Sequence, residues 1–315
     1  MLNFLHNDSE FKELLAIVSF RKGIDTALVE KDYWIMHILY GLNHQGIDFE
    51  LKGGTSLSKG FNLIKRFSED IEIHIKTTLG LETEGNEDNP RVKKARKAFY
   101  DRLSQEIKID GITEVERDFD FDDYKYRSGG IRLYYTTFAP ALIGLKEGIL
   151  LEAGFDTVTP NQPVDISCWV LDYVKSLNVT FKYIDNTAKG VCCYHPGYTL
   201  VEKLQTIVNK YRKELANTDK PKNFMRQYYD VYCLLNNQEV LNFIGTSEYQ
   251  THVKERFHGA DKQIPLIDHP ALLLPDNGVR KSFKQRYIDS SKLYYEVQPD
   301  FDVILAGIKE HIHKF

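Results

Sequence analysis

A six-residue run, DIEIHI from Asp70 to Ile75, constrains the fold of this chain more than any other segment. Polar residues alternate with isoleucine along it. This period of two is typical of a β-strand with one face in the core, because successive side chains of a strand point to opposite faces. The isoleucines therefore enter a core, while Asp70 and Glu72 project side by side from the other face. The run predicts a strand inside a sheet.

A pair of glycines precedes this strand. The letters FELKGG predict a short strand that ends at Gly53 and Gly54, followed by a helix capped by Thr55 or Ser56. Glycine lets the backbone adopt a positive φ and approach a ligand closely. The N–H groups at the start of a helix bind anions. The stretch therefore predicts a phosphate site with extra hydroxyl donors.

The two acids of the strand have two explanations. Carboxylates held side by side repel each other, and Mg²⁺ or Mn²⁺ is the usual compensation. Asp70 and Glu72 alone also fit an exposed strand whose polar face happens to be acidic. Together with a preceding phosphate site, they fit metal-assisted phosphoryl or nucleotidyl transfer. The turn is not a P-loop, because G-x-x-x-x-G-K-[ST] is absent, and it does not fit a dinucleotide fingerprint.

The rest of the chain predicts an α+β half followed by a mainly helical half. The 315 residues exceed what one small core needs. Alternating hydrophobic residues between positions 112 and 185 predict further strands, whereas the later segments have helical periodicity. We place the boundary so that an α+β domain with N-terminal helices covers residues 1–192 and a helical domain covers residues 193–315.

Composition narrows the functional classes. The formal net charge of −4 excludes a global basic field, but it does not exclude a local basic patch. The segment RKSFKQR, Arg280–Arg286, fits either a nucleic-acid contact or a solvated helix face. No apolar run is long enough for a bilayer and no secretory leader precedes the chain, so we expect a cytoplasmic protein without a membrane partner. The four cysteines form no CxxC pair, which predicts free thiols and argues against a zinc site.

The stretch LKGGTSLSKGFNLIKRFSEDIEI resembles the signature of the AbiEii/AbiGii-type nucleotidyltransferase toxins, a branch of the polymerase-β-like nucleotidyltransferase superfamily. That superfamily has a Gly-Gly/Ser turn, a short helix and a D-x-[DE] strand. Further matches are EKDYW, ILLEAGF and the helix pair VEKLQTIV and MRQYYDVYCLL, so the resemblance covers roughly residues 28–235. It implies a polymerase-β-like core, a mixed sheet with flanking helices, ahead of a helical domain.

The resemblance also implies roles for individual residues. Asp70 and Glu72 match the metal ligands, although the family more often has aspartate where Glu72 stands. Glu152 matches a third carboxylate, which completes the metal site or acts as a general base. Lys203 matches a lysine that binds the nucleotide phosphates, and Asp230 matches a helix aspartate that faces the site. The residues expected to bind the nucleotide are Gly53, Gly54, Thr55, Ser56, Lys59, Arg66 and Lys203.

Several of these residues have a plainer explanation. Glu152 also fits a lone glutamate at a sheet edge, and Lys203 also fits a surface helix lysine. Asp230 also fits an intrahelical ion pair with Arg226, which lies four residues earlier. The cations that follow the glycine turn, such as Lys59, also fit a solvated helix face.

Together these residues predict a Mg²⁺-dependent (or Mn²⁺-dependent) nucleotidyltransferase that moves NMP from an NTP to an acceptor hydroxyl. The resemblance makes it the toxin of a toxin–antitoxin or phage-defence system, with RNA or tRNA as acceptor and an antitoxin protein as partner. Two alternatives stay open. One is a catalytically weak nucleotide-binding module that acts through a partner protein, and the other is a phosphotransferase that acts on a protein hydroxyl.

Overall fold

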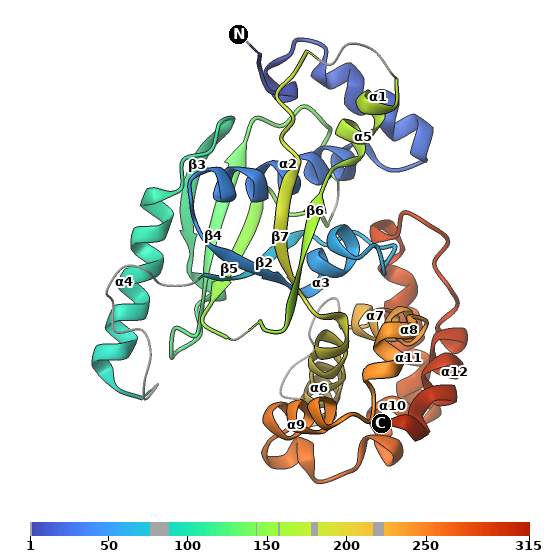
Figure 1. The fold of residues 1–315 in the computed structure, drawn as a ribbon. Helices are drawn as coiled ribbons and strands as arrows, with labels where there is room; N and C mark the ends of the chain where they lie inside the picture. The colour runs from blue at the N-terminus through green and yellow to red at the C-terminus, as the bar shows by residue number, and fades with distance from the viewer. Residues whose placement is uncertain (1, 76–87, 143, 157, 178–181, 217–223) are drawn as a thin grey trace. The chain divides into compact units, whose positions relative to one another are not determined.

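The structure is a computed structural model that describes residues 2–75, 88–142, 144–156, 158–177, 182–216 and 224–315. The chain divides into two compact units (Figure 1). The first contains Met1–Phe61 and Phe67–Tyr194, and the second contains Asn62–Arg66 and His195–Phe315.

A seven-stranded mixed sheet forms the centre of the first unit, in the order β3-β4-β5-β2-β1-β7-β6. β2 (Asp70–Ile75) is antiparallel to β1 (Phe49–Lys52) and parallel to β5 (Ile149–Gly154). The strand predicted from DIEIHI is confirmed, and its isoleucines are buried while its polar residues are half-buried. The other strands are β3 (Ile112–Asp118), β4 (Ser128–Tyr135), β6 (Asn161–Ile166) and β7 (Ala188–Tyr194).

Helix α2 (Thr26–His44) runs across the strands of the sheet (Figure 1) and packs on β7 and β5. Every residue from 27 to 39 is buried, so this helix has no solvent-facing side over that length. α4 (Pro90–Glu106) packs on β3 and β4 at the edge of the sheet. The other helices of this unit are α1 (Phe11–Lys22), α3 (Gly53–Thr55), α5 (Trp169–Ser176), and the turns η1 (Leu5–Asn7), η2 (Ser56–Gly60) and η3 (Phe119–Phe121).

The second unit is helical. α6 (Pro196–Leu215) packs against α7 (Arg226–Leu235), which in turn packs against α12 (Phe301–His311). Its other helices are α8 (Gln238–Phe243), α9 (Ser247–Arg256), α10 (Pro270–Leu273) and α11 (Asn277–Asp289), with turns η4 (Gly259–Lys262), η5 (Leu266–Asp268), η6 (Ser291–Leu293) and η7 (Ile312–Lys314). The predicted fold class, a mixed sheet with flanking helices followed by a mainly helical part, is confirmed.

The five residues 62–66 differ from the sequence-based division, which placed them in the first domain. They belong to the second unit, where the buried guanidinium of Arg66 binds Asp230. All four cysteines are free thiols. Among the helices in the described ranges, none combines the length and the apolar character that crossing a membrane requires.

Candidate active site

Strand β1 leads directly into a helical turn. α3 begins at Gly53, immediately after β1 ends at Lys52, and continues as the π-helical turn η2 to Gly60. The predicted cap at Thr55 or Ser56 is wrong, because Lys52 occupies the N-cap position and makes no side-chain capping hydrogen bond. Gly53 permits this early start because its φ is +72°, a region that residues with a Cβ disfavour.

The hydroxyl groups of the turn hold its backbone. Thr55 Oγ1 donates to the carbonyl of Asp70 (2.5 Å), which ties the turn to the start of β2. Ser56 Oγ donates to the carbonyl of Gly53 (3.0 Å), and Ser58 Oγ donates to that of Thr55 (3.5 Å). Each hydroxyl has one proton to donate. The donors that this turn offers to an anion are therefore its backbone N–H groups rather than its hydroxyls.

Three acids lie on one face of the sheet beside this turn. Glu72 pairs with Lys52 across β1 and β2, and with Glu152 across β2 and β5. Paired residues share a face of the sheet, and so do residues two apart on one strand, which adds Asp70. A methyl group built onto Gly53 would overlap the carboxyl group of Glu72. The glycine turn and the acidic face are thus in direct contact.

The charges of this face shift the pKa of Glu152. Burial and the negative charges of Glu72 and Asp70 raise the pKa of Glu152 to about 7, against the opposing effect of Lys52. Repulsion between like charges disfavours the ionised form of a carboxyl group. A cation bound beside these acids would relieve that repulsion.

The donor chemistry of this face fits a divalent cation. Asp70, Glu72 and Glu152 supply the carboxylate oxygens that Mg²⁺ and Mn²⁺ prefer. Within the described part of the chain, no three histidine, cysteine, aspartate or glutamate side chains converge closely enough to hold a metal ion by themselves. Mg²⁺ usually keeps several waters and binds through one or two carboxylates plus substrate phosphates. One or two of these acids therefore fit an ion that is also held by a substrate phosphate.

Sequence reasoning missed the buried charges of α2, the letters EKD of EKDYW. Glu30, Lys31 and Asp32 are at most 3% exposed. The carboxyl group of Glu30 accepts hydrogen bonds from the N–H groups of Phe138 (2.8 Å) and Ala139 (3.0 Å), in the segment between β4 and β5. The signal was available, because three consecutive charges in a helix with apolar residues on every face must place at least one charge in the core.

Lys31 connects α2 to the strand that carries Glu152. Its Nζ donates to the carbonyl of Gly148 (2.8 Å), one residue before β5 begins. Burial lowers the pKa of Lys31 to about 8, and the negative charges of Glu69 and Asp70 partly oppose that shift. Lys31 is therefore a buried cation that interacts electrostatically with the acidic face.

Asp32 connects α2 to the glycine turn. Its carboxyl group accepts hydrogen bonds from Lys59 Nζ in η2 (2.6 Å) and from the N–H group of Trp169 (2.7 Å). Asp32 is fully buried, and the Lys59 side chain is 14% exposed. Lys59 was predicted to bind the nucleotide, and in the structure its ammonium group is paired with Asp32.

The three other predicted charges come together in the second unit. Asp230, fully buried, accepts hydrogen bonds from Arg66 Nε (2.7 Å) and Nη2 (2.6 Å), and its other cationic partner is Lys203 Nζ (3.1 Å). Burial opposes ionisation of Asp230, but Arg66 and Lys203 outweigh it and hold the pKa of Asp230 below its usual value. Asp230 is therefore bound by cations from outside its own helix, in addition to any role of Arg226.

The basic segment of α11 is largely neutralised within the second unit. Arg280 binds Asp302 (2.6 Å), Lys284 binds the same carboxyl group (2.7 Å), and Arg286 binds Glu214 (2.6 Å). These ion pairs favour the interpretation of this segment as an ordinary helix face.

Residues 37–307, most of the chain, match the family described as "AbiEii: Nucleotidyl transferase AbiEii toxin, Type IV TA system". The chain belongs to the AbiEii family of nucleotidyltransferase toxins. The resemblance read from the glycine turn and the acidic strand is thereby confirmed. No curated protein matches the sequence significantly. One solved structure, of an antigenic nucleotidyltransferase-like protein from Paracoccidioides brasiliensis, is 13% identical, with a TM-score of 0.36 and coverage of 72% of this chain and 87% of that chain.

Proposed function

We propose that this AbiEii chain transfers a nucleoside monophosphate from an NTP to an acceptor hydroxyl. The oxygen of the acceptor attacks the α-phosphorus, the bond from that phosphorus to the pyrophosphate oxygen breaks, and pyrophosphate leaves. One observation supports this most strongly. The turn that begins at Gly53 packs against the carboxyl group of Glu72, and Glu152 lies opposite Glu72 on the next strand.

The residues of the first unit have different roles in this reaction. The backbone N–H groups at the start of the turn, from Gly53 to Thr55, bind and orient the phosphates. Asp70, Glu72 and Glu152 would hold Mg²⁺ or Mn²⁺, and such an ion neutralises phosphate charge when bound. As the alternative to binding the ion, Glu152 takes the proton of the acceptor hydroxyl as a general base.

The biological setting is part of the same proposal. We propose an RNA acceptor, tRNA first, for a toxin that acts in the cytoplasm in a toxin–antitoxin or phage-defence system, with an antitoxin as partner. The family description, which names a type IV toxin–antitoxin system, supports the antitoxin. Lys203 and Asp230 stay candidates for nucleotide binding or catalysis, and their 3.1 Å contact supports their acting together.

The test uses two labelled forms of each NTP. The protein is incubated with Mg²⁺, bulk RNA and NTP labelled on the α- or the γ-phosphate, with Asp70→Ala as control. The proposal expects α-label on RNA with wild type and at least ~100-fold less with the variant, a loss typical for removal of a group that stabilises the transition state. Label from the γ-phosphate on protein would favour the phosphotransferase instead. Mg²⁺-independent NTP binding without any labelling would favour the nucleotide-binding module.

A further inference from the structure

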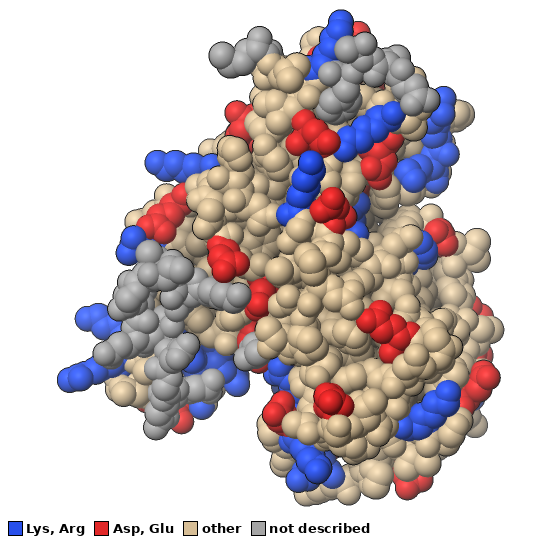
Figure 2. All heavy atoms as spheres, viewed as in Figure 1, with Lys and Arg blue, Asp and Glu red and all other residues tan. Residues whose placement is uncertain are grey.

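The N-terminal half of α4 is rich in cations. The stretch from residue 90 to residue 100 contains no acid, and the first turn of the helix has none. The positive end of the helix dipole disfavours the cations of the first turn, Arg91 and Lys93. Figure 2 shows Lys and Arg side chains projecting at the edge of the molecule where Figure 1 places α4. The cations of this stretch are Arg91, Lys93, Lys94, Arg96 and Lys97, of which Arg91, Lys94 and Lys97 are exposed. Lys97 pairs with Asp101 (2.8 Å).

An exposed aromatic ring lies beside these cations. Tyr124, in the loop between η3 and β4, is 72% exposed. The Nζ of Lys93 lies 5.1 Å from the centroid of its ring, and the Nζ of Lys125 lies 5.5 Å from it. Cations that alternate with exposed aromatic rings are typical of surfaces that bind single-stranded nucleic acid, where rings stack on bases and cations contact phosphates.

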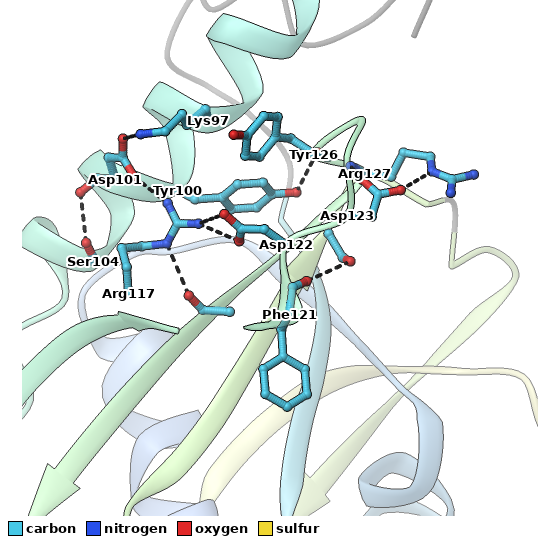
Figure 3. A network of polar contacts seen from close by, with 12 residues as sticks. Lys97, Tyr100, Asp101, Ser104, Arg117, Phe121, Asp122, Asp123, Tyr126 and Arg127 are labelled. Carbon is cyan, nitrogen blue, oxygen red and sulfur yellow. Dashed lines mark hydrogen bonds and ion pairs between the residues drawn. The ribbon is translucent and has the colours of Figure 1, made fainter. Parts of the chain in front are cut away.

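Ion pairs hold this loop against α4 (Figure 3). The guanidinium group of Arg117 binds Asp101 of α4 and also Asp122 of the loop (2.6 Å). Asp123 accepts a hydrogen bond from Arg127 Nε (2.6 Å) and from the Arg127 N–H group (2.7 Å). The loop and the helix therefore present one ordered surface.

α4 and the acidic face lie on opposite faces of the sheet, because Gly129 of β4 faces Tyr100 of α4 whereas the next residue, Gly130, shares a face with Glu152. The loop enters β4 at Ser128, and Gly130 of β4 pairs directly with Glu152 of β5. Gly130 lies three positions after Arg127, which is about 10 Å of extended strand. Phe121, just before the loop, lies against Gly130 on the face of Glu152, so a single strand that passes from α4 over the loop can reach that face.

We propose that Arg91, Lys93, Lys94 and Tyr124, here called the α4 surface, bind the single-stranded part of the RNA acceptor. The cations contact phosphates and Tyr124 stacks on a base. The inference rests on the proposed function for the identity of the acceptor. An acidic protein could pair with the cations but has no base to stack on the ring of Tyr124. RNA offers both phosphates and bases, so the exposed ring between two lysines favours RNA.

The test measures RNA binding without NTP. Variants are Arg91→Glu with Lys94→Glu, and separately Tyr124→Ala. The control, Lys262→Glu with Lys281→Glu, makes the same charge change at two exposed positions of the second unit. Fluorescence anisotropy follows a labelled single-stranded RNA of about 15 nucleotides over a range of salt concentrations.

We expect the Arg91/Lys94 double variant to bind about tenfold or more weakly near physiological salt, and its log–log salt slope to fall by about 1.4. Tyr124→Ala should weaken binding by about fivefold or more with an unchanged slope. The control should bind like wild type. The melting temperature of the Arg91/Lys94 variant should stay the same or rise, because acids are favoured at a helix N-terminus.

The inference would be overturned if the Arg91/Lys94 variant kept the RNA affinity and the salt slope of wild type. An equal loss of RNA affinity in the control would also overturn it. Failure of the α4 surface and failure of the proposed transfer reaction give different results. RNA binding that depends on the α4 surface without any labelling of RNA would remove the proposed function and leave the surface. Efficient labelling of RNA by the Arg91/Lys94 variant at limiting RNA would remove the surface and leave the function.

Discussion

Gly53 is constrained both by its own backbone conformation and by the side chain of Glu72 that packs against it. Its φ is +72°, and Glu72 occupies the space a Cβ would need. We expect Gly53→Ala to cost about 1–2 kcal/mol of folding free energy and also to displace Glu72, so that nucleotidyl transfer falls by at least ~10-fold. Chemical denaturation and the labelling assay measure the two effects.

Gly23 supplies the matched control for this substitution. Its φ is +64° and no atom lies within 4 Å of the position that a methyl group would occupy, so Gly23→Ala adds backbone strain without displacing a neighbour. We expect a similar loss of stability with wild-type transfer. Full activity in Gly53→Ala would contradict the role given to the contact between Gly53 and Glu72.

Glu152 gives the site a pH dependence. Its pKa is raised from 4.5 to about 7, so its protonation favours the fold at pH below about 4.5, and that stabilisation is lost as the pH rises to 7. Glu152→Gln should abolish this loss, which is on the order of 3 kcal/mol or less, and should lower transfer by roughly 100-fold. Melting curves without metal and rate profiles between about pH 5 and 8 test both; a rate unaffected by Glu152→Gln would exclude the general-base role.

At the scale of residues, the sequence predicts what depends on local alternation. The shared face of Asp70 and Glu72 follows from the period of a strand alone. The high pKa of Glu152 does not, because it requires β5 to pair with β2 across nearly 80 intervening residues. A parallel pairing of that kind leaves no local pattern in the sequence.

At the scale of elements, α2 holds the parts that frame the site. Consecutive helix residues point about 100° apart, so Glu30, Lys31 and Asp32 reach three different segments only because α2 is buried on every side. This explains why charged residues occupy a helix that is otherwise almost entirely apolar. These residues position the turn and the strands without being required to touch the substrate.

A double-mutant cycle tests the contact between Asp32 and Lys59. Asp32→Ala leaves a largely buried ammonium group without its carboxylate, so we expect a loss of about 3 kcal/mol. Adding Lys59→Met should restore part of that stability, because the unpaired charge is removed as well. Urea denaturation of both single variants and the double variant gives the coupling free energy, and strictly additive losses would show that the pair does not hold the turn.

The sequence was less informative about where elements begin. It predicts a strand, a glycine turn and a helix in the correct order, but the predicted cap at Thr55 or Ser56 was wrong. Hydroxyl residues usually cap helices, and here Thr55 and Ser56 instead donate to backbone carbonyls within and beyond the turn. The positive φ of Gly53 moves the start of the helix forward.

At the scale of the whole molecule, the second unit depends on one buried carboxylate. Asp230→Ala leaves Arg66 and Lys203 without their acceptor, and we expect a loss of about 3–5 kcal/mol. The pKa of Asp230 is lowered, so its contribution is present above about pH 4 and is lost as the pH falls further. Denaturation at pH near 7 and near 3 measures this; a loss below about 1 kcal/mol at neutral pH would contradict it.

The ion pair between Arg66 and Asp230 also accounts for a feature of the fold that could not be predicted from the sequence. Arg66 and Asp230 are 164 positions apart, and their contact draws residues 62–66 into the second unit. Helical periodicity after position 195 predicts a helical part, but it cannot predict that a short segment ahead of β2 joins it. The α+β core and the helical part are predictable from local patterns, whereas their exact membership depends on long-range ion pairs.

In the proposed function, the glycine turn and the acidic face together bind one metal–nucleotide complex. Calorimetric titration of wild type and Glu72→Gln with an NTP, each with and without Mg²⁺, measures whether they do. We expect wild type to bind the NTP at least ~10-fold more tightly with Mg²⁺, and Glu72→Gln to lose most of that gain. NTP binding of equal strength with and without Mg²⁺ in wild type, or the same Mg²⁺-dependent gain in Glu72→Gln, would contradict the claim.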